Sequence, residues 1–504
     1  MIRRCIVCLI TAYSLLGSAF AQATKTGTAQ RFNPIIPDFI ADPSVVMFRD
    51  TFYMYATTDI DRGLEKMGPP VVWKSTDFVN WHFSGILETG INWDRPYTYK
   101  DTKGNDKTGY FRYWAPGKTL FQNGTYYLFP TIVKPDGSVG TYVMTGRKPD
   151  GPFSFTNGTG IYFNEPEKTT TETKPLIDDI DGEPFVDDDG KTYIYWRRRM
   201  AAALSSDLLT LAGDKVQIPT KYGGYSEGPG LFKRNNIYYY FYTLSGNASY
   251  HNGYMMSREG PLSGFKNPDG NNIFIFSDTS KGVWGPGHGN VFKMPGKDAF
   301  YFLYLEYGEG STTRQVFVNK MEFNADGTLK PVEVNSNGVA YLVKSAVSKK
   351  INLALNANVS ASSYKKDRLV KGTITPNPDM IKPNVRLATI SAERTFSYIP
   401  ANAADASNGT RWMADTADKK PWIMFDLGKI KKISSVEMYF VTPVYGHAWT
   451  MEKSTDGKNW TVSATEKTQA VKSPHVAANI GKARYIRIHI NKGTAGLWEC
   501  KIFE

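Results

Sequence analysis

Cysteine is scarce in this sequence, and its scarcity limits how the folded chain can be stabilised. Three cysteines occur among 504 residues, namely Cys5, Cys8 and Cys500. We expect the first two to be removed with an amino-terminal leader, which leaves Cys500 without a partner in the same chain. A framework of internal disulfide bonds is therefore excluded, and the folded state has to rely on its hydrophobic core.

Long apolar segments are also missing, apart from one short run at the amino terminus. A basic pair precedes the apolar run Cys5–Leu16, and Ala19-Phe20-Ala21 has the small-x-small pattern of a cleavage site. The run is too short to span a bilayer, so it predicts a signal peptide over residues 1–21 and a secreted or periplasmic protein. A lipid anchor needs a cysteine directly after the apolar run, whereas both early cysteines lie within it.

Runs of like charge are short, although the chain is basic overall. The formal net charge is +12, and it falls to +10 when Arg3 and Arg4 are removed with the signal peptide. The longest run of basic residues is Arg197-Arg198-Arg199, which follows a predicted strand. Nucleic-acid-binding proteins usually gather their basic residues on one face or stripe. The sequence therefore favours a solvated basic surface and no nucleic-acid partner.

Aromatic residues, glycine and proline are plentiful, and this mixture favours strands joined by tight turns. An aromatic pair, once replaced by Thr-Tyr, recurs five times directly after turn-forming residues and before an apolar stretch typical of a buried strand. The pairs are Phe52-Tyr53, Tyr126-Tyr127, Thr192-Tyr193, Tyr238-Tyr239 and Phe300-Tyr301. Their spacing of a little over sixty residues suits four short strands with loops. The repeat therefore predicts an all-β, five-bladed β-propeller.

One register position in each repeat carries a polar or aromatic side chain. Eleven to thirteen residues before the second member of each pair stand Asp42, Trp114, Asp181, Glu227 and His288. Equivalent positions of successive blades surround the central channel of a propeller, so we expect these five side chains to converge. Three of them are carboxylates, the residue type that acid–base chemistry on a glycosidic bond requires.

Short motifs surround these positions in a fixed order along the chain. They are Asn33-Pro34-Ile35-Ile36-Pro37 with Ala41-Asp42-Pro43-Ser44, the S-x-D-x-x-x-W segment Ser75–Trp81, Trp114-Ala115-Pro116, Ile180-Asp181 with 185–190, Ser226-Glu227-Gly228-Pro229, and Gly287-His288-Gly289 with Arg314. Together they resemble glycoside hydrolase family 43 over roughly residues 30–340. The resemblance implies a propeller catalytic domain that hydrolyses glycosides with inversion and requires no cofactor.

The same resemblance assigns roles to the three carboxylates. Asp42 is expected to be the general base, and Glu227 the general acid that protonates the departing oxygen. Asp181 is expected to orient Glu227 and to raise its pKa by like-charge repulsion. An inverting enzyme needs room for a water molecule, so the base and acid carboxylates are expected about 6.5–9.5 Å apart.

Other residues are weaker candidates for substrate binding. Trp114 is expected to stack on a sugar or to pack in the core, and Arg314 to bind a ring hydroxyl or steady a carboxylate. His288 is a candidate ligand of an axial Ca²⁺ ion or a site that orders water, as the resemblance implies. Candidate walls of the pocket are Trp73, Trp196 and Trp284, with core packing as the alternative for at least one of them.

The blade-like sequence pattern ends before a linker predicted at 341–350, and different motifs follow it. The motifs of residues 351–504 are Asn352-Leu353-Ala354, Ala403-Ala404-Asp405 with Thr410-Arg411-Trp412, Trp422–Gly428, Ser454–Trp460, Ala483–Ile488 and Leu497-Trp498-Glu499. They resemble the coagulation factor 5/8 type C domain, a discoidin-like jelly-roll β-sandwich that includes carbohydrate-binding module family 32. The resemblance implies a structural Ca²⁺ near Asp405, Asn408, Thr410 and Glu499. Sugar binding and simple buttressing of the propeller both remain open, and the insertion at 365–394 has no predicted role.

We expect the chain to act on plant-type poly- or oligosaccharides, first as an exo-acting α-L-arabinofuranosidase. The alternatives within the family are β-xylosidase and galactosidase or galactofuranosidase activity. A non-catalytic sugar-binding propeller is the alternative from another class. The segments Ser75–Trp81 and Ser454–Trp460 resemble Asp-boxes and so suggest a sialidase as a further alternative. The arginine cluster and tyrosine nucleophile that a sialidase requires cannot be assembled from the blade pattern. The Glu-Cys motif of retaining fructosidases occurs only at Glu499-Cys500, in the second domain.

Overall fold

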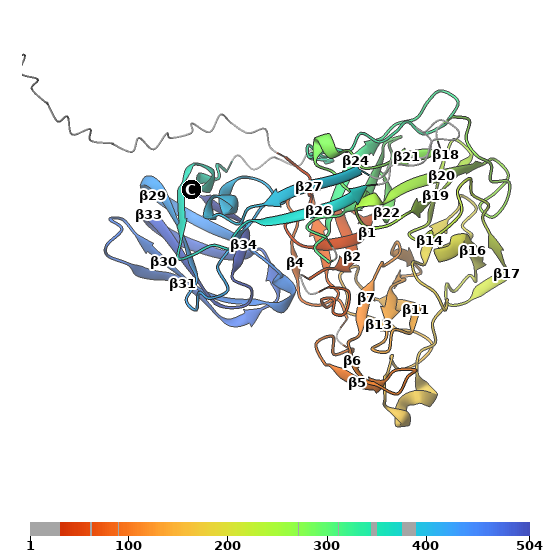
Figure 1. Ribbon diagram of the computed structural model, residues 1–504, viewed down its shortest axis with the longest axis horizontal. Coiled ribbons are helices and arrows are strands. Elements are labelled where there is room, and N and C mark those ends of the chain that lie inside the picture. The colour runs from red at the N-terminus through yellow and green to blue at the C-terminus, as the bar shows by residue number, and fades with distance from the viewer. Residues whose placement is uncertain are drawn as a thin grey trace, which may run out of the picture. The chain divides into compact units, whose positions relative to one another are not determined.

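The computed structural model describes residues 31–60, 63–88, 90–270, 272–310, 312–343, 350–374 and 390–504, and strands make up nearly all of its regular structure (Figure 1). The predicted signal peptide and most of the predicted linker lie outside these residues. The helical segments are short 3-10 turns, namely η1 (Pro166–Thr171), η2 (Arg197–Arg199), η3 (Asn247–Ser249), η4 (Thr279–Lys281), η5 (Leu353–Asn356), η7 (Pro400–Ala404) and η8 (Pro443–Tyr445). Among the described residues, no helix is long and apolar enough to cross a membrane. The all-β prediction is confirmed.

The first part of the chain forms successive antiparallel sheets, coloured from orange to green in Figure 1. The first is β1-β2-β3, from β1 (Ile40–Phe48), β2 (Thr51–Thr58) and β3 (Val72–Ser75). Two sheets follow, β11-β10-β7 and β13-β12-β9-β8, from β7 (Arg112–Trp114), β8 (Leu120–Gln122), β9 (Thr125–Leu128), β10 (Thr131–Val133), β11 (Val139–Thr141), β12 (Met144–Gly146) and β13 (Phe153–Phe155).

Three more sheets complete this part of the chain, each with its strands in sequence order. They are formed by β14 (Glu183–Val186), β15 (Thr192–Trp196), β16 (Met200–Leu204) and β17 (Leu211–Gln217); by β18 (Gly230–Arg234), β19 (Ile237–Leu244), β20 (His251–Ser257) and β21 (Ile273–Ile275); and by β22 (Gly289–Lys293), β23 (Phe300–Glu306) and β24 (Gln315–Met321). A separate hairpin pairs β5 (Tyr97–Lys100) with β6 (Asp106–Gly109).

Hydrophobic clusters join these sheets to one another in a closed ring. One cluster links β1–β3 to β7–β13, the next links β8–β9 to β15–β16, and a third links β14–β16 to β18–β20. A fourth links β18–β20 to β22–β24, and a fifth links β22–β24 back to β1–β3. This is the packing that a five-bladed propeller requires. The number of blades stays a prediction, because β7–β13 divide into two sheets.

The aromatic pairs of the repeat lie where the pattern predicts, in the second strand of each group. They fall in β2, β9 and β19 and open β15 and β23. The turn before β19 shows why such pairs follow turn-forming residues. Asn235 and Asn236 have φ angles of 50° and 58°, and they connect strands whose paired ends are Arg234 and Ile237. Asparagine tolerates this left-handed conformation, which matches a two-residue hairpin turn to the twist of its strands.

The amino-terminal end of the described chain closes the ring against its last sheet. The Asn33 side chain donates to the Val318 carbonyl at 3.0 Å and accepts from the Val318 N–H at 2.9 Å, as a strand partner would. Two residues later, the Ile35 N–H donates to the Val316 carbonyl at 3.0 Å. The segment before β1 therefore continues the hydrogen bonding of β24.

The last part of the chain forms a β-sandwich with its own core. Its strands are β25 (Asn358–Ala361), β28 (Trp412–Met413), β29 (Trp422–Phe440), β30 (His447–Ser454), β31 (Thr461–Ala470), β33 (His475–Lys492) and β34 (Gly496–Phe503). Their order is β28-β34-β29-β33-β30-β31, with β25 on β29, and Trp412, Phe425 and Ile488 are buried between them. A short pair joins β4 (Phe83–Ser84) to β32 (Lys472–Ser473). Cys500 is buried in this core and forms no disulfide bond.

The two segments that resemble Asp-boxes form the same turn. Asp77 accepts from two backbone N–H groups at 2.8 Å and from the Asn80 side chain at 2.7 Å. Asp456 accepts from two backbone N–H groups at 2.8 Å and from the Asn459 side chain at 2.7 Å. Both carboxylates are occupied in closing a turn. Turn formation therefore accounts for these motifs without sialidase chemistry.

The insertion at 365–394 contains a hairpin that packs on the propeller. Strand β26 (Arg368–Ile374) pairs with β27 (Ile390–Phe396) over their whole length. Val370 and Ile374 share a hydrophobic cluster with Ala248 and Trp284 of the propeller. The insertion thus joins the two domains, a role that its sequence did not reveal.

Candidate active site

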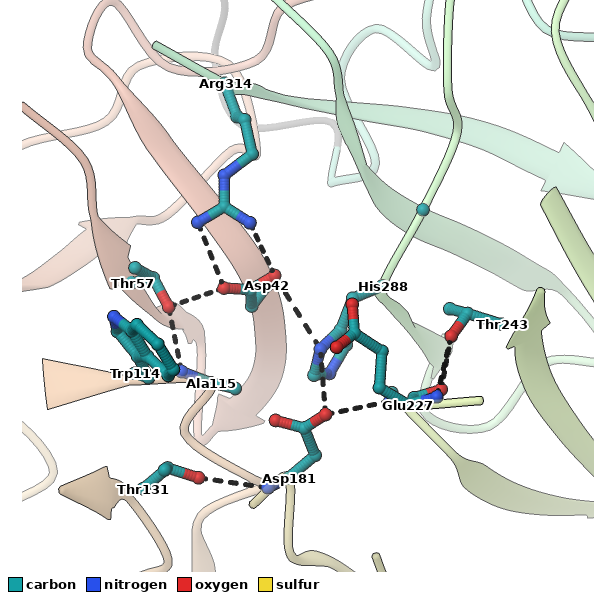
Figure 2. A network of polar contacts seen from close by, with 12 residues as sticks. Asp42, Thr57, Trp114, Ala115, Thr131, Asp181, Glu227, Thr243, His288 and Arg314 are labelled. Carbon is teal, nitrogen blue, oxygen red and sulfur yellow. Dashed lines mark hydrogen bonds and ion pairs between the residues drawn. The ribbon is translucent and has the colours of Figure 1, made fainter. Parts of the chain in front are cut away.

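The five register positions lie at the start of their sheets and come together in space (Figure 2). Asp42 lies within β1 and Trp114 ends β7. Asp181, Glu227 and His288 come shortly before β14, β18 and β22. Figure 2 shows the carboxylates of Asp42 and Asp181 on either side of the His288 ring, with Glu227 beside it. The repeat pattern therefore identified side chains that the structure brings together.

Asp42 is held rigidly at an irregularity of β1. Its φ of 51° lies in the left-handed region, where the register between β1 and β2 shifts, and such a bulge re-aims a side chain. The Thr57 hydroxyl donates to Asp42 Oδ2 at 2.7 Å and accepts from the Ala115 N–H at 2.8 Å. One oxygen of the carboxylate is thus fixed by β2 and by the segment that follows β7.

Arg314 links Asp42 to a second buried carboxylate, Asp59. Its guanidinium donates to the two Asp42 oxygens at 3.3 and 3.4 Å, and its Nε and Nη2 each lie 2.9 Å from an oxygen of Asp59. Burial opposes the charge on Arg314, but Asp42 and Asp59 outweigh it and raise the Arg314 pKa. Arg314 therefore steadies a carboxylate, which is one of its two predicted roles. Burial raises the pKa of Asp59, against the attraction of Arg314.

Asp181 is buried, with 5% of its surface exposed, and it contacts the chain next to Glu227. Its Oδ2 accepts from the Gly228 N–H at 2.9 Å, and the Asp181 N–H donates to the Thr131 hydroxyl at 3.0 Å. His288 Nδ1 lies 3.8 Å from Asp181 Oδ2 and 3.6 Å from Asp42 Oδ1. Burial, opposed by His288 and assisted by repulsion from Glu227, raises the pKa of Asp181 to about 7. Asp181 thus binds the backbone directly after Glu227, while its predicted role in orienting the acid stays a prediction.

The carboxylate of Glu227 receives two tyrosine hydroxyls that the sequence did not reveal. Tyr250 donates to Oε1 and Tyr225 donates to Oε2. The backbone of Glu227 is fixed as well, because its N–H donates to the Thr243 hydroxyl at 3.0 Å. Burial and the neighbouring Glu227 carboxylate raise the pKa of Tyr250, so this hydroxyl keeps its proton and acts as a donor.

The glycine after Glu227 is required by its backbone and by its neighbour. Gly228 has a φ of 53°, and a Cβ atom there would lie 2.6 Å from His288 Cγ. Only glycine avoids both the left-handed penalty and this overlap. The E-G-P motif thus allows His288 to approach the backbone beside the acid candidate.

The predicted tryptophans divide into one side chain at the site and three in the core. Trp114 is half-buried, contacts Met67 Sδ through its ring N–H, and lies under the Arg112 guanidinium. The structure corrects the prediction of pocket walls, since Trp73, Trp196 and Trp284 are only 1–3% exposed. Each belongs to a hydrophobic cluster that joins neighbouring parts of the fold. Large aromatic side chains gain most by such burial, and a sequence pattern does not show which face they occupy.

The candidate calcium ligands fit a metal only in part. Among the described residues, no group of three His, Cys, Asp or Glu side chains is arranged to hold a metal ion, and this includes the surroundings of His288. In the sandwich, Glu499 is buried, and burial together with repulsion from Asp405 raises its pKa. Thr410 donates to Asp405 at 2.7 Å. The Asn408 side-chain NH₂ group donates to the Pro34 carbonyl of the propeller at 3.0 Å, and its predicted role as a calcium ligand stays a prediction.

The second domain and several relatives can be identified by comparison. The F5/8 type C domain matches residues 388–502, which confirms the predicted second domain. The chain is 28% identical over 337 residues to a β-D-galactofuranosidase of Aspergillus niger, covering 63% of this chain and 89% of that protein. It is 26% identical over 406 residues to an arabinoxylan arabinofuranohydrolase of Bacillus subtilis, covering 68% of this chain and 73% of that protein.

A solved structure covers almost the whole chain, and a family covers the propeller. The structure, described as a glycoside hydrolase, is 38% identical, covers 94% of this chain and 99% of its own, and superposes with a TM-score of 0.81. The family Glycosyl hydrolases family 43 matches residues 32–329, more than half of the sequence. This match contains Asp42, Asp181 and Glu227 within a propeller fold, and the chain therefore belongs to glycosyl hydrolases family 43.

Proposed function

We propose that this family 43 glycosidase is an inverting exo-enzyme that removes terminal α-L-arabinofuranosyl groups from plant-type polysaccharides or oligosaccharides. The observation that carries the proposal is that Asp42, Asp181 and Glu227 come together beside His288, with each carboxylate fixed by different neighbours. The Thr57 hydroxyl and the Arg314 guanidinium both bind the Asp42 carboxylate. Two tyrosines and the Asp181–Gly228 contact hold Glu227 on the neighbouring part of the site.

The proposed reaction uses one water molecule and leaves no covalent intermediate. Asp42 takes a proton from water as the water oxygen attacks the anomeric carbon. The glycosidic bond breaks, and Glu227 gives its proton to the departing oxygen. The separation of the two carboxylates is expected at about 6.5–9.5 Å, which leaves room for the water. Proton NMR of the first anomer formed tests the stereochemistry, and retention would contradict the role of Asp42.

The choice of sugar rests on chemistry that two of the relatives share. One is named a β-D-galactofuranosidase and the other an arabinoxylan arabinofuranohydrolase. The rings of β-D-galactofuranose and α-L-arabinofuranose have the same configuration, and the hexose adds one exocyclic CHOH group. A pocket that discriminates by one such small group gives ratios of roughly 10- to 200-fold. We therefore expect kcat/KM for the α-L-arabinofuranoside to exceed kcat/KM for the β-D-galactofuranoside by roughly 10- to 200-fold.

A panel of four nitrophenyl glycosides tests the substrate. It contains α-L-arabinofuranoside, β-D-galactofuranoside, β-D-xylopyranoside and β-D-galactopyranoside. We expect the first to be cleaved fastest. Faster cleavage of the xyloside or the galactopyranoside would replace the furanoside proposal with one of the alternatives in the same family.

A Glu227→Gln variant separates the hydrolase from a non-catalytic sugar-binding propeller. The amide keeps the shape of the side chain but has no acidic proton to give to the leaving oxygen. Loss of general acid catalysis typically costs about 10²- to 10⁴-fold in rate. An unchanged rate on a substrate with a poorly departing alcohol would contradict the role of Glu227.

We further propose that the protein is exported. Amino-terminal sequencing of secreted material that starts after Ala21 would support this proposal.

A further inference from the structure

The β26–β27 hairpin of the second domain contacts the propeller through two separate groups of residues. Its first contact is with η3, the turn between β19 and β20, where the Ser249 hydroxyl donates to the Thr373 carbonyl at 2.6 Å. Gly372 packs so closely there that an added Cβ would lie 3.0 Å from Ala248 Cβ and 3.1 Å from the Trp284 ring. The hairpin therefore lies directly against the turn that leads into β20.

This first contact lies next in the chain to Tyr250, a hydrogen-bond partner of the general acid candidate. Tyr250 follows Ser249 in the chain and donates its hydroxyl to Glu227. Its N–H donates to the Asn247 carbonyl at 3.2 Å, and its ring packs on Gly287, where a Cβ would lie 2.8 Å away. The direction of the Tyr250 hydroxyl thus depends on the conformation of the turn that the hairpin covers.

The second contact is an ion pair that is largely withdrawn from solvent. Arg394 of β27 donates to the two oxygens of Glu306 at 2.8 and 3.3 Å, and its guanidinium lies 4.3 Å from the Trp284 ring centre. Glu306 accepts in turn from the Trp284 N–H at 2.9 Å and from the Gly308 N–H at 2.8 Å. Arg394 therefore fixes the first turn of the loop between β23 and β24.

That loop carries Arg314, which holds the base candidate. Gly308 lies against the Thr313 backbone, because an added Cβ would be 1.9 Å from the Thr313 carbonyl oxygen. Arg314 follows Thr313 directly and pairs with Asp42 and Asp59. The hairpin is thus connected by short chains of contacts to the partners of both proposed catalytic carboxylates.

We propose that the β26–β27 hairpin is a positioning element of the active site, acting through Tyr250 on Glu227 and through the β23–β24 loop on Arg314. Gly372 and Arg394 are its positioning residues, and neither touches the substrate. Hydrolysis at the full rate therefore requires the second domain in the same chain. This inference rests on the proposed function, since it assumes that Glu227 and Asp42 carry the reaction.

The test compares four variants of the full chain on the best nitrophenyl glycoside of the panel. Gly372→Val pushes the hairpin away from Ala248, and Arg394→Ala removes the ion pair with Glu306. Arg394→Lys keeps the charge but loses the two-pronged geometry. Lys371→Ala is the matched control, because Lys371 is exposed on the same hairpin and pairs only with Glu393 at 2.7 Å among the described residues.

Misplacement of catalytic groups by a distant change costs up to about 10²-fold in rate. We expect kcat to fall roughly 10- to 100-fold in Gly372→Val and Arg394→Ala, with KM changed less than threefold. Arg394→Lys should recover part of the loss, and Lys371→Ala should match the wild type. Hydrogen exchange at the 247–250 and 306–310 backbone should be faster in the two impaired variants and normal in the control.

A double variant decides whether the hairpin acts through Tyr250. If it does, Gly372→Val should cost far less in a Tyr250→Phe background than in the wild type, because coupled residues are not additive. Full additivity, or unchanged kcat in Gly372→Val and Arg394→Ala with intact melting curves, would overturn the proposal. A loss of kcat that merely follows a fall in melting temperature would also overturn it. A wild type that cleaves no glycoside fails the proposed function instead, and faster exchange at 247–250 would then still report the coupling.

Discussion

Replacing Asp181 by asparagine should change how the stability of the propeller depends on pH. Burial raises the pKa of Asp181 from 3.8 to about 7 in the folded protein. The folded state therefore binds this proton more tightly than the unfolded chain, and the resulting stability is present at low pH. It is lost as pH rises from the unfolded pKa through the folded pKa. Because one pKa unit corresponds to about 1.4 kcal/mol, the loss amounts to about 4 kcal/mol between roughly pH 4 and pH 8.

The assay is urea unfolding of the wild type and of Asp181→Asn at several pH values, so that other titrating groups cancel in the difference. The asparagine cannot ionise, so the variant should gain about 4 kcal/mol relative to the wild type across this range. Asp77→Asn is the control. Burial raises the pKa of Asp77, but hydrogen bonds from Asn80 and Val79 outweigh it and lower the pKa. Its stability difference should thus be flat above about pH 5, and a flat curve for Asp181→Asn would refute the reasoning.

Three further outcomes are expected from changes around the site and in the sandwich. Gly228→Ala should lower kcat roughly 100-fold by displacing His288, as measured by steady-state kinetics, and an active variant would contradict the need for close approach. Arg314→Lys should lower kcat/KM at least about tenfold, because a lysine ammonium cannot pair with both Asp42 and Asp59 as the planar guanidinium does. Calcium at 100 times its dissociation constant should stabilise the sandwich by about 2.7 kcal/mol, seen as a raised melting temperature that Glu499→Gln abolishes.

The repeat pattern was sufficient to find residues that share a register. Strand and turn signals recur locally, so Asp42, Asp181 and Glu227 could be identified from spacing alone, and the structure brings them to one place. Contacts between distant sheets leave no such signal. Asp59 and Arg314 are separated by 255 residues, and only the folded ring brings them within 2.9 Å.

The burial of the tryptophans and the contact between the two domains could not be predicted from the sequence either. The sequence made Trp73 and Trp196 candidate walls of the pocket, yet each side chain packs in a hydrophobic cluster between sheets. Tyr250 lies in no motif, and its approach to Glu227 depends on a turn covered by a hairpin from the second domain. The insertion that forms this hairpin has no repeat and no family pattern, so its docking surface could only come from the structure.

The pairing of Asn33 with Val318 sets an order of events during synthesis. The two residues are 285 positions apart, so the ribosome must produce the last propeller strand before the ring can close. Until then, the backbone groups of Val316 and Val318 have no partner from the first segment, and the apolar faces of the first and last sheets stay open. Contacts between distant residues form slowly, and open strand edges invite association with other chains. The edges of the first and last sheets are therefore exposed to association with other chains until β24 has been made and has paired with the first segment.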